Sequence, residues 1–202
     1  ATISTNEYKF GSSSGYFNGS ADLEYSDLEL GSSDFTFETW VYVSSIGSRQ
    51  YIFDTRGGGS GGVLLTVEAN GKVLFSGGII SSDIYSTSTL SNNTWYHLAA
   101  VRDGSTARLF VNGTQEATNS ISGTAPGDEL KIGSKSDGAS KLTGYLEEFR
   151  LSIGVARYTS NFTPQTREFY PATGVDDITS NNNDGFEVDT TFNTVQPKSY
   201  EL

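Results

Sequence analysis

The sequence contains no cysteine, four prolines and a single histidine among 202 residues. Without cysteine no disulfide supports the fold, and cysteine usage does not distinguish a reducing from an oxidising compartment. The lone histidine, His97, excludes a zinc site built from several histidines. Because it lies between Tyr96 and Leu98 in an apolar run, we interpret it as a core residue rather than a ligand or a base.

Basic residues and long apolar runs are also scarce. Thirteen Lys and Arg residues stand against 24 Asp and Glu, which gives a formal net charge of −11. Binding to nucleic acid or to an anionic membrane surface depends on Lys and Arg, so neither partner is expected. No window of about 18 apolar residues occurs, so no membrane insertion is expected.

Short apolar runs separated by glycine, serine, threonine and asparagine are abundant, a pattern typical of many strands joined by tight turns. Asn70-Gly71, Asp103-Gly104 and Asn112-Gly113 each separate two such runs. They predict three type I′ hairpins that together form an antiparallel meander. Further strands are expected near residues 7, 21, 51, 129 and 144.

The segment 34–43 alternates with period two, yet neither of its faces is purely polar. Phe35, Phe37, Val41 and Val43 share one face, and Trp40 shares the other with Glu38 and Tyr42. A strand that is apolar on both faces is covered on both, which predicts a central strand whose outer face is shielded by loops or by a partner. We therefore predict an all-β fold, a two-sheet antiparallel sandwich of jelly-roll kind, in one domain over residues 1–164.

After Pro164 the sequence becomes acidic and polar, with isolated aromatics such as Phe169, Tyr170 and Tyr200. Such a segment does not bury enough apolar surface to fold by itself. We predict that residues 165–202 form an extended C-terminal arm. The aromatics indicate that it docks on its own sandwich or on a neighbouring subunit, and a solvated tail is the alternative.

The blocks FTFETWVYV, NTWYHLAAVRDGSTARLFVNGTQ, LKIGS and GYLEEFRLSIGVARYTSNFTP resemble the laminin G-like, concanavalin A-like lectin jelly rolls. The resemblance covers about residues 7–164. The last block resembles the version of this domain found in bacteriophage tail fibres and other virion surface proteins. The resemblance implies binding of glycans or proteins by surface loops rather than catalysis, often beside a calcium ion.

The resemblance also implies where a structural calcium ion would lie. In related jelly rolls the ion ties an early loop to the last strand, and the matching positions here are Gly19, Asp22 and Glu147. The family usually has Asp at the last of these positions, so Glu147 is a departure. The alternative is that Asp22 caps a turn and that the glutamate is surface charge.

Ligand-binding candidates come from a charged pair and from tyrosines near turns. Asp54 and Arg56 precede a glycine-rich loop and either form a recognition rim or hold the strand end by hydrogen bonds. Aromatic rings stack on the apolar faces of sugars, which makes Tyr85 and Tyr158 candidates beside Tyr16 and Tyr25. Packing is the alternative for each of these tyrosines.

An enzymatic function is not expected. Glycosidases place two carboxylates on one face of a cleft, whereas Glu147 and Glu148 are adjacent and should point to opposite faces of a strand. The leading hypothesis is a virion surface protein, either a tail-fibre adhesin or a capsid decoration. It would be homo-oligomeric and would bind a host-surface glycan or other virion subunits. The alternatives are an extracellular carbohydrate-binding or adhesion module of a secreted bacterial protein and, third, a glycan-cleaving enzyme.

Overall fold

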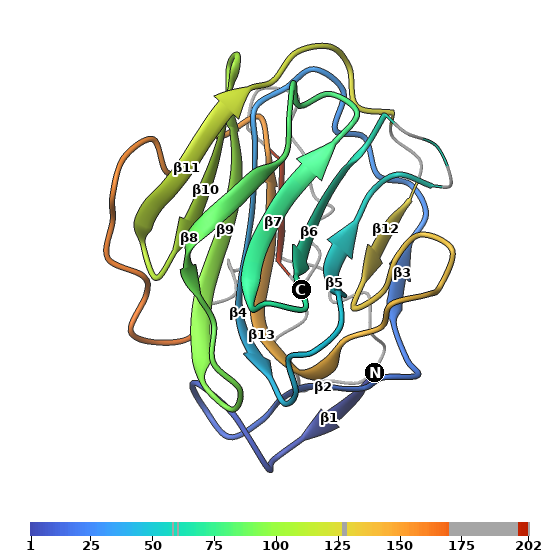
Figure 1. Cartoon of the computed structure of the whole chain (residues 1–202), viewed down its shortest axis with the longest axis vertical. Helices are drawn as coiled ribbons and strands as arrows, with labels where there is room; N and C mark the ends of the chain where they lie inside the picture. The colour runs from blue at the N-terminus through green and yellow to red at the C-terminus, as the bar shows by residue number, and fades with distance from the viewer. Residues whose placement is uncertain (58, 60, 127–128, 170–197, 202) are drawn as a thin grey trace.

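The computed structural model describes residues 1–57, 59, 61–126, 129–169 and 198–201, which form a sandwich of two antiparallel sheets (Figure 1). The predicted all-β jelly roll is confirmed. No helix among these residues is long and apolar enough to cross a membrane.

One sheet, which we call the large sheet, has eight strands. Its order is β1 (Thr2–Ser4), β2 (Ser14–Asn18), β13 (Thr143–Ile153), β4 (Phe35–Val43), β9 (Trp95–Asp103), β10 (Thr106–Val111) and β11 (Thr114–Ser120), with β14 (Lys198–Glu201) beside β13. The small sheet has six strands, in the order β3 (Leu23–Tyr25), β12 (Leu130–Ile132), β5 (Gln50–Asp54), β6 (Val63–Val67), β7 (Lys72–Gly77) and β8 (Ile84–Thr89).

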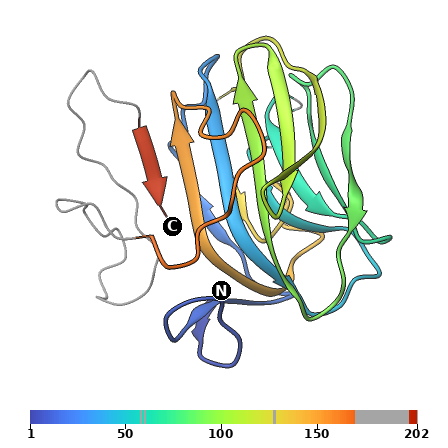
Figure 2. The same cartoon turned by 90° about the vertical axis from the view of Figure 1, so that its left-hand side faces the viewer.

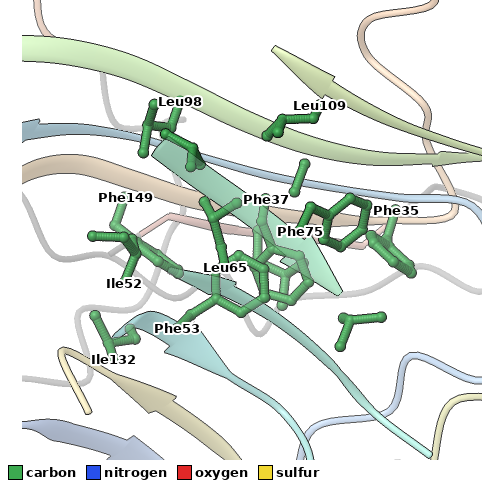
Figure 3. Packing of buried hydrophobic residues seen from close by; sticks show 14 of the residues in the cluster. Phe35, Phe37, Ile52, Phe53, Leu65, Phe75, Leu98, Leu109, Ile132 and Phe149 are labelled. Carbon is green, nitrogen blue, oxygen red and sulfur yellow. The ribbon is translucent and has the colours of Figure 1, made fainter. Parts of the chain in front are cut away.

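The apolar core lies between the two sheets (Figure 3). Phe37 of β4 stacks on Phe53 of β5 with ring centroids 4.0 Å apart, so these rings join the large sheet to the small one. Phe35, Val41 and Val43 are at most 1% exposed and complete the inner face of β4, as its alternation predicts. The outer face of β4 therefore carries Glu38, Trp40 and Tyr42.

The three predicted hairpins are present as β6–β7, β9–β10 and β10–β11. They do not form one meander, because the first belongs to the small sheet and the other two to the large sheet. Only Asn112-Gly113 has both residues at positive φ, as a type I′ turn requires. In the first hairpin Gly71 N donates instead to Glu68 O across a longer loop.

Residues 5–13, which we call the N-terminal loop, lie between β1 and β2, so the strand expected near residue 7 is wrong. The amides of Lys9 and Phe10 donate to the Glu147 carboxylate, at 2.6 and 2.7 Å, instead of joining a strand ladder. A side chain from β13 thus satisfies the backbone of this loop.

Residues 155–169, which we call the strap, cross the outer face of the large sheet (Figure 2). Thr36 of β4 donates to Val155 O (3.0 Å) and accepts from Arg157 N (2.9 Å). Farther along, Phe162 N donates to Gly113 O (2.9 Å) in the β10–β11 turn. The strap also packs apolar side chains on the sheet, and the cluster comprises Ala99, Val101, Phe110, Ala156, Tyr158 and Phe162.

The strap lies over Thr36 and Glu38 of the central strand β4, and the N-terminal loop lies over Trp40. Of the two predicted ways of shielding the outer face of this strand, by loops or by a partner, the structure shows the first. The predicted domain boundary at residue 164 falls within the strap. The strap continues to Phe169, and the Phe169 amide donates to Glu148. Of the predicted arm, residues 170–197 and 202 lie outside the described residues. Residues 198–201 form β14, which pairs with residues 150–153 of β13.

A bulge in β13 changes the direction of its two glutamates. Its register against β4 shifts between Glu147 and Arg150, and Glu148 has a positive φ of 55°. Phe149 enters the core. The Glu147 carboxylate accepts amides of the N-terminal loop, and the Glu148 carboxylate accepts an amide of the strap. These two segments meet where Glu168 lies against Gly11. The expectation that the glutamates point to opposite faces is therefore wrong, because the bulge breaks the alternation on which it depended.

Candidate functional site

Four aromatic side chains form a row across the outer face of the large sheet. The row runs from Tyr16 on β2 through Tyr145 on β13 and Tyr42 on β4 to Trp95 on β9, and each neighbouring pair is directly opposed in the strand register. The ring centroids are 5.0, 5.5 and 5.5 Å apart in succession. Cross-strand pairing on a twisted sheet thus lines up residues that are distant in sequence.

This aromatic row remains accessible at its edges. Tyr16, Tyr42 and Trp95 are half-buried, and Tyr145 is 9% exposed. Burial, together with the neighbouring Glu7 carboxylate of the N-terminal loop, raises the pKa of Tyr42 above its ordinary value. The row therefore combines ring surface with tyrosine hydroxyls and a nearby carboxylate. A sugar has matching groups, because its apolar face stacks on rings and its hydroxyls form hydrogen bonds.

Next to the row, the N-terminal loop covers Trp40. This indole, 7% exposed, carries the Lys9 ammonium 4.1 Å from its ring centroid and meets the edge of Phe10 at 5.7 Å. Its Nε1 is buried and finds no acceptor within the described part of the chain. Such a donor is uncommon in folded proteins, so the indole carries an unused hydrogen-bonding group beneath the N-terminal loop.

Glu147, which anchors the N-terminal loop, is 8% exposed. Burial raises its pKa to about 7 in spite of the two amide hydrogen bonds from Lys9 and Phe10. The Glu168 carboxylate adds to this rise, and the Lys9 ammonium opposes it. At neutral pH the side chain is consequently divided between its two protonation states.

Under the strap lies a buried polar cluster around Glu38, which is 1% exposed. Its carboxylate accepts from Arg150 Nε and Nη2, at 2.8 and 2.6 Å, and from the Tyr158 hydroxyl at 2.6 Å. His97 Nε2 lies 3.3 Å from the same carboxylate. Burial opposes ionisation, but the His97 contact and the Arg150 charge together hold the pKa of Glu38 below its ordinary value.

The predicted charged pair makes structural contacts at the end of β5. Asp54 is fully buried and accepts from Arg56 N, Nε and Nη2 as well as from Ser136 N. Arg56 also donates to the Tyr51 hydroxyl at 3.3 Å. The acceptor capacity of Asp54 is therefore used within the fold, in agreement with the structural alternative.

The two predicted tyrosines lie in different surroundings. Tyr85 is 44% exposed on β8 of the small sheet, away from the row on the large sheet. Tyr158 stacks on Phe162 with centroids 3.5 Å apart and donates to Glu38. One face of the Tyr158 ring is thus covered, so this tyrosine fixes the strap instead of offering an open stacking surface.

The predicted calcium ligands have separate partners. Asp22 accepts from Ser134 Oγ and Lys141 Nζ, and Glu147 accepts from the N-terminal loop. Gly19 N donates to Leu142 O. The three predicted ligands thus make their hydrogen bonds to different parts of the fold, and no group of three or more acidic or histidine ligands occurs in the described ranges.

Sequence reasoning found only Tyr16 of the aromatic row. The alternation of 34–43 placed Tyr42 on a face with Glu38 and Trp40, but the row becomes visible only when β13 is inserted between β2 and β4. The signal available in the sequence was that the strands 35–43 and 95–103 and the segment after residue 144 each carry an aromatic facing away from the core. The pairing that unites them is non-local.

A protein-family model described as the concanavalin A-like lectin/glucanases superfamily, of laminin G type, matches residues 16–155, so the chain belongs to this family. No curated protein matches the sequence.

Several solved structures share the fold at low sequence identity. A Bacteroides ovatus protein assigned to carbohydrate binding is 22% identical, with a TM-score of 0.57, over 72% of this chain and 44% of that one. Domain 4 of an extracellular GH43 arabinanase from Geobacillus stearothermophilus, solved in complex with arabinotriose, is 14% identical with a TM-score of 0.60 over 77% of both chains. The sialidase CBM40 module of Ruminococcus gnavus, bound to α2,3-sialyllactose, is 13% identical with a TM-score of 0.51 over 70% of this chain and 95% of that one. The chain therefore spans less than half of the first of these relatives.

Proposed function

We propose that this chain is a carbohydrate-binding module whose ligand lies across the aromatic row. The observation that carries the proposal is the row itself, in which neighbouring strands of one sheet hold four rings in register. Rings fixed on a sheet lose little conformational entropy on binding, and they stack on the apolar faces of sugars. The glycan complexes of the arabinanase domain and the sialidase module support the same class of ligand.

The proposed activity is binding without catalysis. A glycosidase needs one carboxyl group that protonates the leaving oxygen and a second that acts as base or nucleophile. Glu38 is buried under the strap and bonded to Arg150 and Tyr158. Glu147 accepts two backbone amides of the N-terminal loop, and Glu148 accepts the Phe169 amide of the strap. These three carboxylates thus make contacts that hold the fold.

For the biological setting, the proposal is the surface of a bacteriophage virion, where the module would bind a host-surface glycan or another copy of itself. The support is the resemblance of the closing block, whose residues 155–164 form most of the strap. A secreted bacterial protein is the alternative setting. Capsid or tail genes on either side of its gene would favour the virion, and genes for secreted polysaccharide-degrading enzymes would contradict it.

The ligand site is tested with a glycan array that includes arabinotriose and α2,3-sialyllactose, followed by titration of the best ligand against single variants. Tyr42→Ala and Trp95→Ala should each weaken binding by about tenfold or more, because each removes one stacking ring. Tyr85→Ala, an exposed ring on the small sheet, is the matched control and should bind like the wild type. Equal loss in the control, or no loss in the row variants, would contradict the proposed site.

A further inference from the structure

Lys9 occupies a position that resembles that of a bound ligand. Its side chain belongs to an exposed loop residue, yet its ammonium lies 4.1 Å above the centroid of Trp40. A cation over the face of an indole is attracted by the ring quadrupole, and indole is the strongest of the aromatic partners. The contact covers an aromatic ring that lies two residues before Tyr42 on the same face of β4, directly beside the aromatic row.

The Glu147 carboxylate accepts the amides of Lys9 and Phe10, and Glu147 lies directly opposite Trp40 in the register of β13 and β4. Glu147 feels the Lys9 charge, Glu168 lies close enough to Glu147 to raise its pKa, and Glu7 neighbours Tyr42. The whole chain also carries a net charge of −11. An aromatic face bordered by acidic groups on an anionic protein favours cationic ligands over neutral ones.

We propose that the Trp40 face, bordered by Glu147, is an ammonium-binding subsite at the edge of the aromatic row, and that Lys9 fills it in the unliganded protein. In the bound state the ammonium of an amino-sugar residue replaces that of Lys9. The Trp40 Nε1, which has no acceptor among the described residues, then donates to a hydroxyl of the same ligand. The choice of an amino sugar rests on the proposed carbohydrate-binding function, whereas the ammonium subsite itself does not.

The test removes the resident ammonium and supplies one from solution. Lys9→Ala deletes the side chain but keeps the backbone amide that Glu147 accepts. The probes are n-butylammonium, which reproduces the lysine side chain, with n-butanol as its neutral control, and a glucosamine trimer with its fully N-acetylated form as control. Lys135→Ala is the matched protein control, because this lysine pairs with Asp137 in the loop between β12 and β13.

Lys9→Ala should bind n-butylammonium and the glucosamine trimer about tenfold more tightly than the wild type, with no gain for n-butanol or the acetylated trimer. Adding Glu147→Gln or Trp40→Phe to Lys9→Ala should reduce that gain, and Lys135→Ala should show none. No gain for either amine, or an equal gain for the neutral controls, would overturn the subsite.

These outcomes separate the subsite from the proposed function. If n-butylammonium binds Lys9→Ala but the wild type binds no glycan on the array, the subsite holds and the carbohydrate-binding proposal fails. If glycans bind through Tyr42 and Trp95 but neither amine gains from Lys9→Ala, the carbohydrate-binding proposal holds and the subsite fails.

Discussion

A single side chain, Glu147, holds the N-terminal loop, because its carboxyl group accepts the backbone amides of Lys9 and Phe10. Its folded-state pKa, about 7, lies above the ordinary value of 4.5. The folded protein therefore holds this proton to a higher pH than the unfolded chain does. The stability that the group contributes is complete below about pH 4.5 and is lost as the pH rises through about 7.

We expect the wild type to lose about 1–3 kcal/mol of unfolding free energy from this group between pH 5 and pH 8, and Glu147→Gln to lose correspondingly less. Urea denaturation at the two pH values measures the difference. Glu116→Gln is the control: burial opposes ionisation there, but the hydrogen bonds from Ser88 and Thr87 lower the pKa of Glu116, so its titration falls below this window. A pH dependence that is the same in wild type and Glu147→Gln would contradict the assignment.

Glu38 gives the second prediction at this scale. Glu38→Ala leaves the Arg150 guanidinium, only 12% exposed, without this carboxylate, and it removes the acceptor of the Tyr158 hydroxyl. Breaking a buried ion pair from one side is expected to lower the unfolding free energy by about 3–5 kcal/mol. Glu24→Ala removes a carboxylate that is 53% exposed and pairs with Lys131, and it should change stability by less than about 1 kcal/mol. Urea denaturation of the two variants compares them, and equal losses would be inconsistent with a buried network.

At the scale of elements, the strap depends on its contact with the β10–β11 turn. Gly113 has a φ of 77°, and a Cβ there would lie 2.0 Å from Phe162 O. Gly104 has a φ of 57° in the β9–β10 turn, and a Cβ there would meet nothing within 4 Å. The two glycines thus share backbone strain but differ in contact with the strap.

Gly104→Ala should lower the unfolding free energy by about 1 kcal/mol, the ordinary penalty for a side chain at positive φ. Gly113→Ala should lose at least about 1 kcal/mol more, because the added methyl pushes the strap away from the turn. Thermal unfolding measures stability, and the rate of tryptic cleavage after Arg157 measures strap release. Equal cleavage in the two variants would show that the turn does not hold the strap.

Three elements show which parts of the fold follow from the sequence and which do not. The alternation of 35–43 predicted the buried inner face of β4 and the shielding of its outer face, because both follow from period two. The type I′ assignment failed at Asn70-Gly71, where the loop is longer than the dipeptide indicates. The strand expected near residue 7 failed because a glutamate more than a hundred residues away takes up its amides.

The aromatic row, the proposed binding site, was likewise not predictable from local sequence patterns. Period two placed Tyr42 on a definite face of its strand, but a single sequence does not say which strands are neighbours. Tyr145 enters the row only because β13 returns between β2 and β4. The bulge at Glu147 and Glu148 was equally invisible, since no local residue pattern required it.

At the scale of the whole molecule, segments from outside the sheets lie over the outer face of the large sheet. The strap packs on β9 and β10, the N-terminal loop lies over Trp40, and three of the four rings of the aromatic row stay half-buried. The resulting surface is shaped by segments from both ends of the sandwich domain. Ligand binding should consequently be sensitive to changes in the N-terminal loop but not to changes on the small sheet.

The most direct test of this account is an NMR titration of the isotopically labelled chain with the glycan that ranks first on the array. The chain has only two tryptophans, and both lie on the outer face of the large sheet. The account predicts that the Trp95 indole resonance and the amides around Tyr16, Tyr42 and Tyr145 shift with one common affinity. Shifts confined to the small sheet around Tyr51 and Tyr85, with both indole resonances unmoved, would contradict it.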